Sequence, residues 1–225
     1  MDERKFVNLK KNELAVKDFV KGSIGKGKIS TVTIEYTPVG EKIVVATSRP
    51  GLVIGKRGER IEELTKVLKK RFGLDNPHID IKEITLPLLD AQIVADDIAL
   101  LLERDGSLKF KVIAYRMLQD IMKAGALGAE IVLSGKLPSE RAKSWRFSQG
   151  YLKKTGDTAK VVQGAMSQAK TMPGVVGIQV RILPPDAHIH DKIVVDDVMK
   201  QMIEANSVVD EESKTKKSRK KEASK

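Results

Sequence analysis

Helical and strand periodicities alternate along the first part of the chain. Apolar residues spaced three or four positions apart predict a helix over 6–22, with Leu9, Val16, Phe19 and Val20 near one face. A run rich in glycine ends this pattern, and alternating β-branched segments follow, as is typical of strands. The further elements expected up to residue 86 are strands 31–36 and 42–47, a helical turn 49–54, a helix 59–72 with Ile61, Leu64, Leu68 and Phe72 on one face, and a strand 78–84.

Two longer amphipathic helices open the second part of the chain. They are predicted over 90–104 and 108–124. A strongly basic segment, 136–154, lies among the strands that follow, so we expect two helices packed on a small mixed or antiparallel sheet. The packing residues expected are Val94, Ile98 and Leu101, then Phe110, Ile113, Met117 and Ile121, and the strands expected are 129–133, about 158–170 and 177–183.

These elements place the chain in the α+β class with three parts. Residues 1–87 form an αββααβ domain, and residues 88–190 form a two-helix plus four-strand α/β domain. Residues 191–225 form an extension that ends in a basic, low-complexity tail. From Ser213 onward this tail has no apolar periodicity, so we expect it to be disordered when free.

The charge balance narrows the class of partner. A net charge of +11 in 225 residues predicts a polyanionic partner, either nucleic acid or an anionic membrane. No apolar stretch approaches the about 18 residues of a membrane span, and the charged start of the chain predicts no secretory signal. The absence of cysteine excludes disulfides and thiolate metal sites. We therefore expect nucleic acid and no membrane.

The segment Gly55-Lys56-Arg57-Gly58 is the strongest candidate for chemistry. It resembles the GxxG loop with which KH domains clamp about four nucleotides of single-stranded RNA or DNA. Glycine lets the backbone approach a phosphate, Lys56 and Arg57 supply positive charge, and the next helix points its first amides at the same anion. Arg60, in the first turn of that helix, is also a candidate. The element order around this loop is that of the type II KH fold.

The sequence offers little support for further GxxG loops, a P-loop or a metal site. The GxxG spacings at 125–128 and 174–177 are interpreted as a helix end and a turn. Residues 22–28 resemble the start of a P-loop, but Ile29 replaces the Mg²⁺-binding hydroxyl and a helix precedes the loop, which argues against nucleotide hydrolysis. His188, His190 and Asp191 are expected to be surface residues rather than metal ligands. We expect no catalytic residue, no metal and no cofactor.

Aromatic residues lie inside the basic segment. Trp145, Phe147 and Tyr151 share strand parity, so they are expected on one face. They could stack on bases, but core packing is the interpretation that we favour. The cations of the segment, which few acids oppose, fit phosphate binding better.

The chain resembles the universal small-subunit ribosomal protein three family in its archaeal form. The resemblance spans residues 5–185 and is carried by Arg49–Gly58, Val94–Asp96 with Leu101 and Glu103, Gly128–Leu137, Arg141–Tyr151 and Gly174–Leu183. It implies a structural, non-enzymatic constituent of the cytoplasmic ribosome. Such a protein would bind small-subunit rRNA and neighbouring proteins in the head, line the mRNA entry channel and aid mRNA unwinding.

Carried over by position, the resemblance implies specific RNA contacts. The KH loop is Gly55–Gly58, and a helix facing incoming mRNA carries Lys109, Lys111 and Arg116. The residues expected to contact rRNA or the channel wall are Arg141, Lys143 and Arg146.

Two alternatives remain open from the sequence. One is a dissociable KH factor of ribosome maturation or transcription. The other is a lyase in which a lysine forms a Schiff base with an abasic sugar, which would need a desolvated lysine that is neutral near pH 7.

Overall fold

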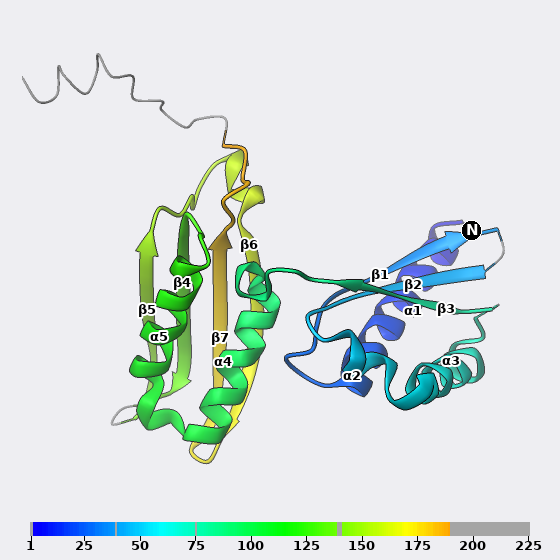
Figure 1. The fold of residues 1–225 in the computed structure, drawn as a ribbon, viewed down its shortest axis with the longest axis horizontal. Coiled ribbons are helices and arrows are strands. Elements are labelled where there is room, and N and C mark those ends of the chain that lie inside the picture. The colour runs from blue at the N-terminus through cyan, green and yellow to red at the C-terminus, as the bar shows by residue number, and fades with distance from the viewer. Residues whose placement is uncertain (1, 39, 75, 139–140, 190–225) are drawn as a thin grey trace, which may run out of the picture. The chain divides into compact units, whose positions relative to one another are not determined.

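The computed structural model describes residues 2–38, 40–74, 76–138 and 141–189 (Figure 1). Contacts along the chain group Met1–His188 into one compact unit, and every element described below belongs to it. The tail that the sequence predicts to be disordered lies outside the described residues.

The first part of the chain forms a three-stranded sheet with helices on it. Strand β2 pairs antiparallel with β1 and parallel with β3, so the sheet order is β1-β2-β3. This is the predicted αββααβ order of a type II KH domain. The elements are α1 (Asp2–Ile24), β1 (Ile29–Thr37), β2 (Gly40–Thr47), α2 (Pro50–Ile54), a 3-10 turn (Lys56–Gly58), α3 (Glu59–Phe72) and β3 (His78–Glu83).

The core of this sheet confirms most of the predicted apolar faces. Val16 and Val20 of α1 are buried, as are Leu64 and Leu68 of α3. The expectation for Leu9 is wrong, because this side chain is 54% exposed. Helix α1 continues its apolar periodicity toward its N-terminus, beyond the last side chain that packs on the sheet.

The second part of the chain forms a four-stranded antiparallel sheet in the order β5-β4-β7-β6. Figure 1 shows α4 and α5 side by side on one face of this sheet. The sheet is therefore antiparallel rather than mixed. The elements are α4 (Ala91–Asp105), α5 (Phe110–Lys123), β4 (Gly128–Lys136), β5 (Ala142–Gly150), β6 (Gln163–Thr171) and β7 (Gly174–Leu183).

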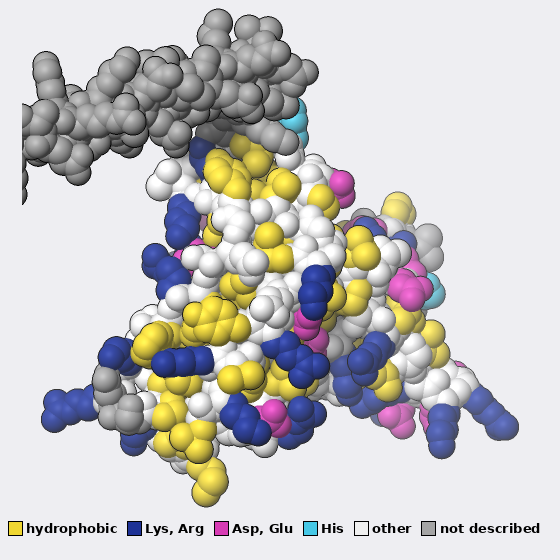
Figure 2. Space-filling view, turned by 60° about the vertical axis from the view of Figure 1, so that its left-hand side comes forward, with side chains coloured by type: hydrophobic (Ala, Val, Ile, Leu, Met, Phe, Trp, Pro, Cys, Tyr) yellow, Lys and Arg dark blue, Asp and Glu magenta, His cyan; other side chains and the backbone are white. Residues whose placement is uncertain are grey.

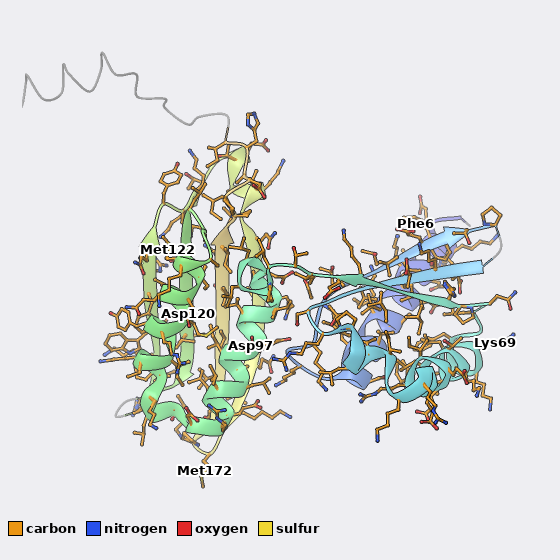
Figure 3. The ribbon with its side chains drawn as sticks, in the orientation of Figure 1. Phe6, Lys69, Asp97, Asp120, Met122 and Met172 are labelled. Carbon is orange, nitrogen blue, oxygen red and sulfur yellow. The ribbon has the colours of Figure 1, made fainter. Side chains whose placement is uncertain are left out.

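One predicted strand is wrong in its first part. Residues Asp157–Val161 form a short 3-10 helix, and only Gln163–Thr171 pair with β7 as strand β6. The segment begins after Gly156, whose φ of 82° breaks an extended backbone. Met172 and Pro173 form the predicted turn, and Figure 3 shows Met172 pointing away from the sheet.

Alternation along β4 separates the two faces of the four-stranded sheet. Ala129, Ile131 and Leu133 are fully buried in one cluster with the apolar faces of α4 and α5, as predicted. Glu130 and Val132 point to the opposite side. We call this side the outer face; its side chains include those of Glu130, Val132 and Ser134 of β4, Ser144, Arg146 and Ser148 of β5, Gln179 and Arg181 of β7, and Met166 and Gln168 of β6.

Two carboxylates, one capping α4 and one within it, accept hydrogen bonds from the start of β1 and the segment before it. Asp90 caps α4 by accepting the backbone N–H of Gln92 at 2.9 Å, and it also accepts the Ser30 hydroxyl at 2.5 Å. Asp96 accepts the backbone N–H of Gly27 at 3.0 Å. Both carboxylates therefore stabilise the fold by accepting hydrogen bonds within the protein.

Gly128 is required where β4 begins. A Cβ at this position would lie 2.1 Å from the backbone oxygen of Tyr151, whereas a Cβ at Gly164 in β6 would meet nothing within 4 Å. We expect Gly128→Ala to lower the free energy of unfolding by about 3 kcal/mol, because backbone must move. Gly164→Ala, the matched control in the same sheet, should be neutral or slightly stabilising. Urea unfolding followed by the single tryptophan measures both, and equal effects would contradict the packing argument.

Asp97 of α4 (Figure 3) should make stability depend on pH. Burial raises the pKa of its carboxyl group above 3.8, and the positive charge of Arg49 opposes this shift. Since the charged form is disfavoured in the folded state, Asp97→Asn should raise the free energy of unfolding near neutral pH. The gain should vanish below 3.8, where both states of Asp97 are protonated.

Asp105→Asn is the control of opposite sign for urea unfolding at the two pH values. The hydrogen bond from Arg104 lowers the pKa of Asp105, so this substitution should reduce stability near neutral pH. A gain for Asp97→Asn that persists at low pH would show that burial of its charge is not the cause.

Candidate nucleic-acid interface

The loop between α2 and α3 is built on left-handed backbone. Gly55, Arg57 and Gly58 have φ values of 75°, 55° and 81°. At Gly55 a side chain is also excluded by space, because a Cβ would lie 2.8 Å from the Cβ of Arg60. Both glycines of the predicted GxxG motif are therefore in conformations that suit glycine, and Arg57 holds the same region at a steric cost.

This backbone exposes the two cations of the loop. Lys56 and Arg57 are both exposed, and Glu59 begins α3 directly afterwards. Gly58 at the helix start supplies no side-chain cap, so the first amides of α3 have no such partner. The loop can thus offer two cations and a helix start to one phosphate.

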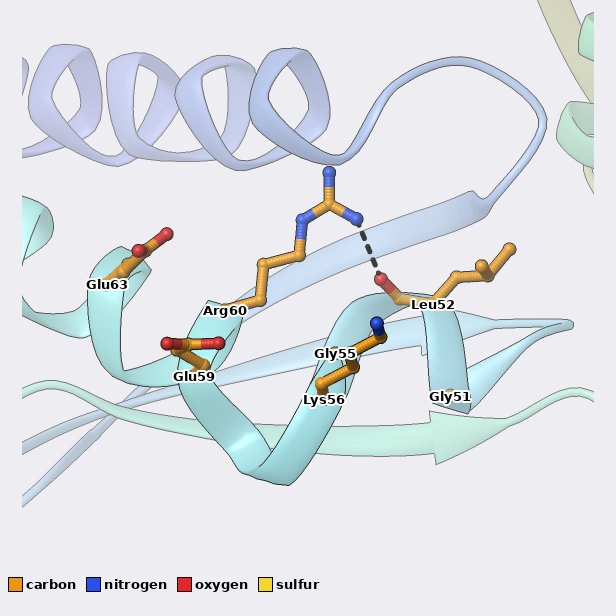
Figure 4. Close-up of a pocket in the computed structure, with 7 residues that line it drawn as sticks. All are labelled: Gly51, Leu52, Gly55, Lys56, Glu59, Arg60 and Glu63. Atoms are coloured by element: carbon orange, nitrogen blue, oxygen red, sulfur yellow. Dashed lines mark hydrogen bonds between the residues drawn. The ribbon is translucent and has the colours of Figure 1, made fainter.

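Arg60 lies in the first turn of α3, as expected, and its side chain also makes a contact within the protein. Its guanidinium donates a hydrogen bond to the carbonyl oxygen of Leu52 at 3.1 Å, as Figure 4 shows. This bond joins α3 to α2 across the loop. The hollow beside it is lined by Gly51, Leu52, Gly55, Lys56, Glu59, Arg60 and Glu63. Direct contact of Arg60 with RNA stays a prediction, whereas its support of the loop is evident.

Lys111 and Lys143 meet at the single tryptophan of the chain. The Nζ atoms of Lys111 on α5 and Lys143 on β5 lie 4.4 Å and 5.6 Å from the centre of the Trp145 ring. The ring also packs on Phe110, with 5.9 Å between centroids. The structure therefore brings together one predicted cation from each of two sequence segments, in a cation–π arrangement.

The other cations predicted on and beside α5 are exposed but separate from this pair. Arg116 follows Lys111 by five residues, which is about 140° around a helix. Lys109 lies just before α5, and Arg141 just before β5. Figure 2 shows Lys and Arg side chains dispersed beside exposed hydrophobic ones on one side of the molecule.

Arg146 points away from Lys143, to the outer face, because adjacent strand positions alternate. Its Nε lies 2.8 Å from Oε1 of Glu130, a side chain that is 2% exposed. Lys154 and Arg181 are paired with the same carboxylate, at 3.4 Å and 4.0 Å. The structure therefore places Lys143 and Arg146 on opposite faces of the sheet, and the contacts of Arg141, Lys143 and Arg146 with rRNA or the channel wall stay predictions.

The aromatic residues follow the predicted core packing only in part. Phe147 is buried and Trp145 is partly buried against the cluster under α5. Tyr151 is 54% exposed, which contradicts a shared face for all three. Strand β5 ends at Gly150, whose φ of 74° interrupts the alternation before Tyr151.

Comparison with known proteins identifies the family. A KH domain model matches residues 15–87, and a model for the C-terminal domain of ribosomal protein S3 matches residues 98–182. Small ribosomal subunit protein uS3 of Methanocaldococcus jannaschii is 40% identical over 94% of this chain and 100% of its own length. The uS3 proteins of Archaeoglobus fulgidus and Methanobrevibacter smithii are 41% and 34% identical, over 93% and 94% of this chain and 90% and 84% of their own lengths.

The chain belongs to the uS3 family. The predicted resemblance to its archaeal members is thereby confirmed, as is the type II KH domain followed by the C-terminal domain of the family. The uS3 proteins are ribosomal proteins rather than enzymes, in agreement with the expectation of no catalytic residue.

Sequence reasoning missed two residues of the group around the Glu130 carboxylate, Glu130 itself and Arg181, and placed Lys154 only among the cations of the basic segment. One signal was available, since Glu130 is a charge in the otherwise apolar run Ala129–Leu133. A charge in a buried strand needs a partner, but the sequence does not say which cations lie beside it.

Several weaker candidates of this uS3 chain find no support. Residues 22–28 cover the end of α1 and the turn before β1, so a helix precedes the loop and a strand follows it, the reverse of the order around a P-loop. In the part of the chain that the structure describes, no three His, Asp or Glu side chains are grouped to hold a metal, and no helix is both long and apolar enough to cross a bilayer. His190 and Asp191 lie outside the described residues.

The strain at Arg57 can be measured. We expect Arg57→Gly to raise the free energy of unfolding by about 0.5–1 kcal/mol, since glycine adopts a φ of 55° without a steric penalty. Lys66→Gly, the same kind of change inside helix α3, should lower it by about 1 kcal/mol. Urea unfolding measures both free energies. A loss of stability in both variants would contradict the left-handed geometry of the loop.

Proposed function

We propose that this protein is a structural constituent of the small ribosomal subunit in the cytoplasm, where it binds rRNA of the head. The observation that carries the proposal is the exposed Lys56-Arg57 pair on the left-handed Gly55–Gly58 backbone of a uS3 chain. The archaeal relatives that match nearly the whole length of this chain are named small ribosomal subunit proteins. The KH loop then holds a phosphate through charge and backbone amides.

The face of α5 and β5 is the proposed contact with mRNA at the entry channel. Lys111 and Lys143 hold their charges beside Trp145, and Arg116 adds a further positive charge on a different side of α5. Cations fixed beside an aromatic ring suit a single strand, whose phosphates and bases are both accessible. This arrangement supports a role in keeping mRNA single-stranded as it enters.

Neighbouring proteins of the head are the remaining proposed partners. Helix α1 leaves hydrophobic side chains uncovered on its first turns, including Phe6 (Figure 3), which is 62% exposed, and Leu9. Exposed apolar groups of this kind suit contact with the surface of another protein.

We also propose that residues 1–87, 88–190 and 191–225 act as separate parts in this assembly.

Sedimentation tests the ribosomal assignment against a dissociable KH factor. The protein from its own cells is sedimented in magnesium buffer and again after a high-salt wash. Stoichiometric association with small subunits after washing supports a constituent. Release by the wash, or sedimentation as free protein, would favour the factor.

A double substitution tests the KH loop. Replacing Lys56 and Arg57 by Asp should weaken binding of a single-stranded RNA oligonucleotide and reduce the slope of log K against log salt by about 1.4, which is 0.7 for each lost phosphate contact. Replacing Lys69 and Lys70 by Asp changes the net charge equally at two exposed positions of α3 (Lys69 is labelled in Figure 3) and is the matched control. Equal losses in both variants would attribute binding to net charge and not to the loop.

A further inference from the structure

A buried carboxylate gathers three cations on the outer face of the four-stranded sheet. Glu130 of β4 lies across from Arg181 of β7 in the strand register, and Arg146 comes from β5 on its other side. Lys154 reaches the same carboxylate from beyond the end of β5. Four segments of the chain thus meet at one acid.

The charges of this group do not balance. One carboxylate opposes three cations, which leaves a local charge of about +2. The cations remain accessible, since the side chains of Arg146, Lys154 and Arg181 are 66%, 47% and 44% exposed. Glu130 itself is almost completely covered, so an outside ligand meets the cations and not the acid.

Donor groups are left over as well. Arg146 approaches Glu130 through Nε, one of three nitrogens of a guanidinium that carries five N–H donors, and an ammonium such as that of Lys154 has three protons. Arg181 lies 4.0 Å from Oε2, an oxygen that accepts no hydrogen bond within the described protein. The acid therefore orients the cations without using all their donors.

The surrounding surface favours a phosphate over a protein carboxylate or an apolar partner. Small polar side chains, Ser144, Ser148 and Gln179, occupy neighbouring positions of the outer face. Glu130 is the only acid among the described strand residues that point to this side. A phosphodiester backbone can accept bonds from several cations at once and slide past such short polar groups.

We propose that Arg146, Lys154 and Arg181 form a second RNA phosphate site, separate from the KH loop, in which Glu130 is a positioning residue. Without a central acid, three cations so close together would repel one another and sample many rotamers. The buried carboxylate holds them in one arrangement before RNA arrives, which lowers the entropy lost on binding. This inference rests on the proposed function, because it assumes that RNA is the ligand.

The experiment uses the full chain and a transcribed RNA of the small-subunit head. Glu130→Gln removes a negative charge, so net charge alone predicts tighter binding. A positioning role predicts the reverse, a loss of about tenfold in affinity, comparable to one charged hydrogen bond. Asp120→Asn (Figure 3) makes the same change of charge on α5, on the opposite side of the sheet, and should tighten binding slightly. Tightening in both variants would overturn the proposal.

A second pair of variants keeps the test decisive if Glu130→Gln does not fold. Arg181→Gln should weaken binding and reduce the salt slope by about 0.7–0.9, since one phosphate contact is lost. Lys123→Gln on α5 removes an equal charge and should leave the slope nearly unchanged. Equal slopes for the two would reject the site.

RNA binding by the wild-type protein shows whether a negative result rejects the proposed function or only the second phosphate site. If it binds the head RNA no better than an unrelated RNA of equal length, the proposed function fails together with this site. Suppose instead that the wild-type protein binds the head RNA specifically, but Glu130→Gln and Arg181→Gln change binding no differently from their controls. The proposed function then stands and the second site is rejected.

Discussion

One-sided burial of the four-stranded sheet is the constraint on which the second half of the molecule depends. Helices α4 and α5 cover one face, so every strand must send alternate side chains into a closed apolar cluster and the others outward. This rule places Trp145 and Lys143 at the helix side and Arg146 on the outer face, although they are close in sequence. Packing of the core therefore decides on which face of the sheet each cation lies. Any contact with RNA must use the cations in those positions.

The KH loop and the cation groups of the second sheet hold charge in different physical ways. The loop depends on backbone: positive φ values at Gly55, Arg57 and Gly58 turn the chain so that two cations are exposed together before α3. On the sheet, side chains position the cations instead. The Trp145 ring does so on one side, and the Glu130 carboxylate does so on the other. Backbone geometry suits a contact that is independent of base identity, whereas side-chain groups can be altered one at a time without reshaping the fold.

Sequence periodicity was sufficient for most of the fold because core burial imposes it directly. The α3 and α5 faces were predicted correctly for this reason. Leu9 failed because a helix can continue past the surface on which it packs, and periodicity does not mark where that surface ends. The prediction that Tyr151 shares a face with Trp145 and Phe147 was wrong because Gly150, with its positive φ, interrupts the alternation of the strand. The KH loop was predictable since its whole geometry is local, but the group around Glu130 depends on strand register, which short-range pattern does not contain.

In the proposed second phosphate site, the role of the buried acid Glu130 is to position cations rather than to change the net charge. A net charge of +11 attracts RNA at long range, but it does so equally for every sequence and weakens with salt. Burial of Glu130 costs free energy that only well-placed cations can offset, so the fold is stable when those cations hold fixed positions. The same requirement that stabilises the carboxylate therefore arranges three positive groups at spacings set by the strands. Fixed spacing, and not total charge, is what lets a rigid surface prefer one RNA backbone path over another.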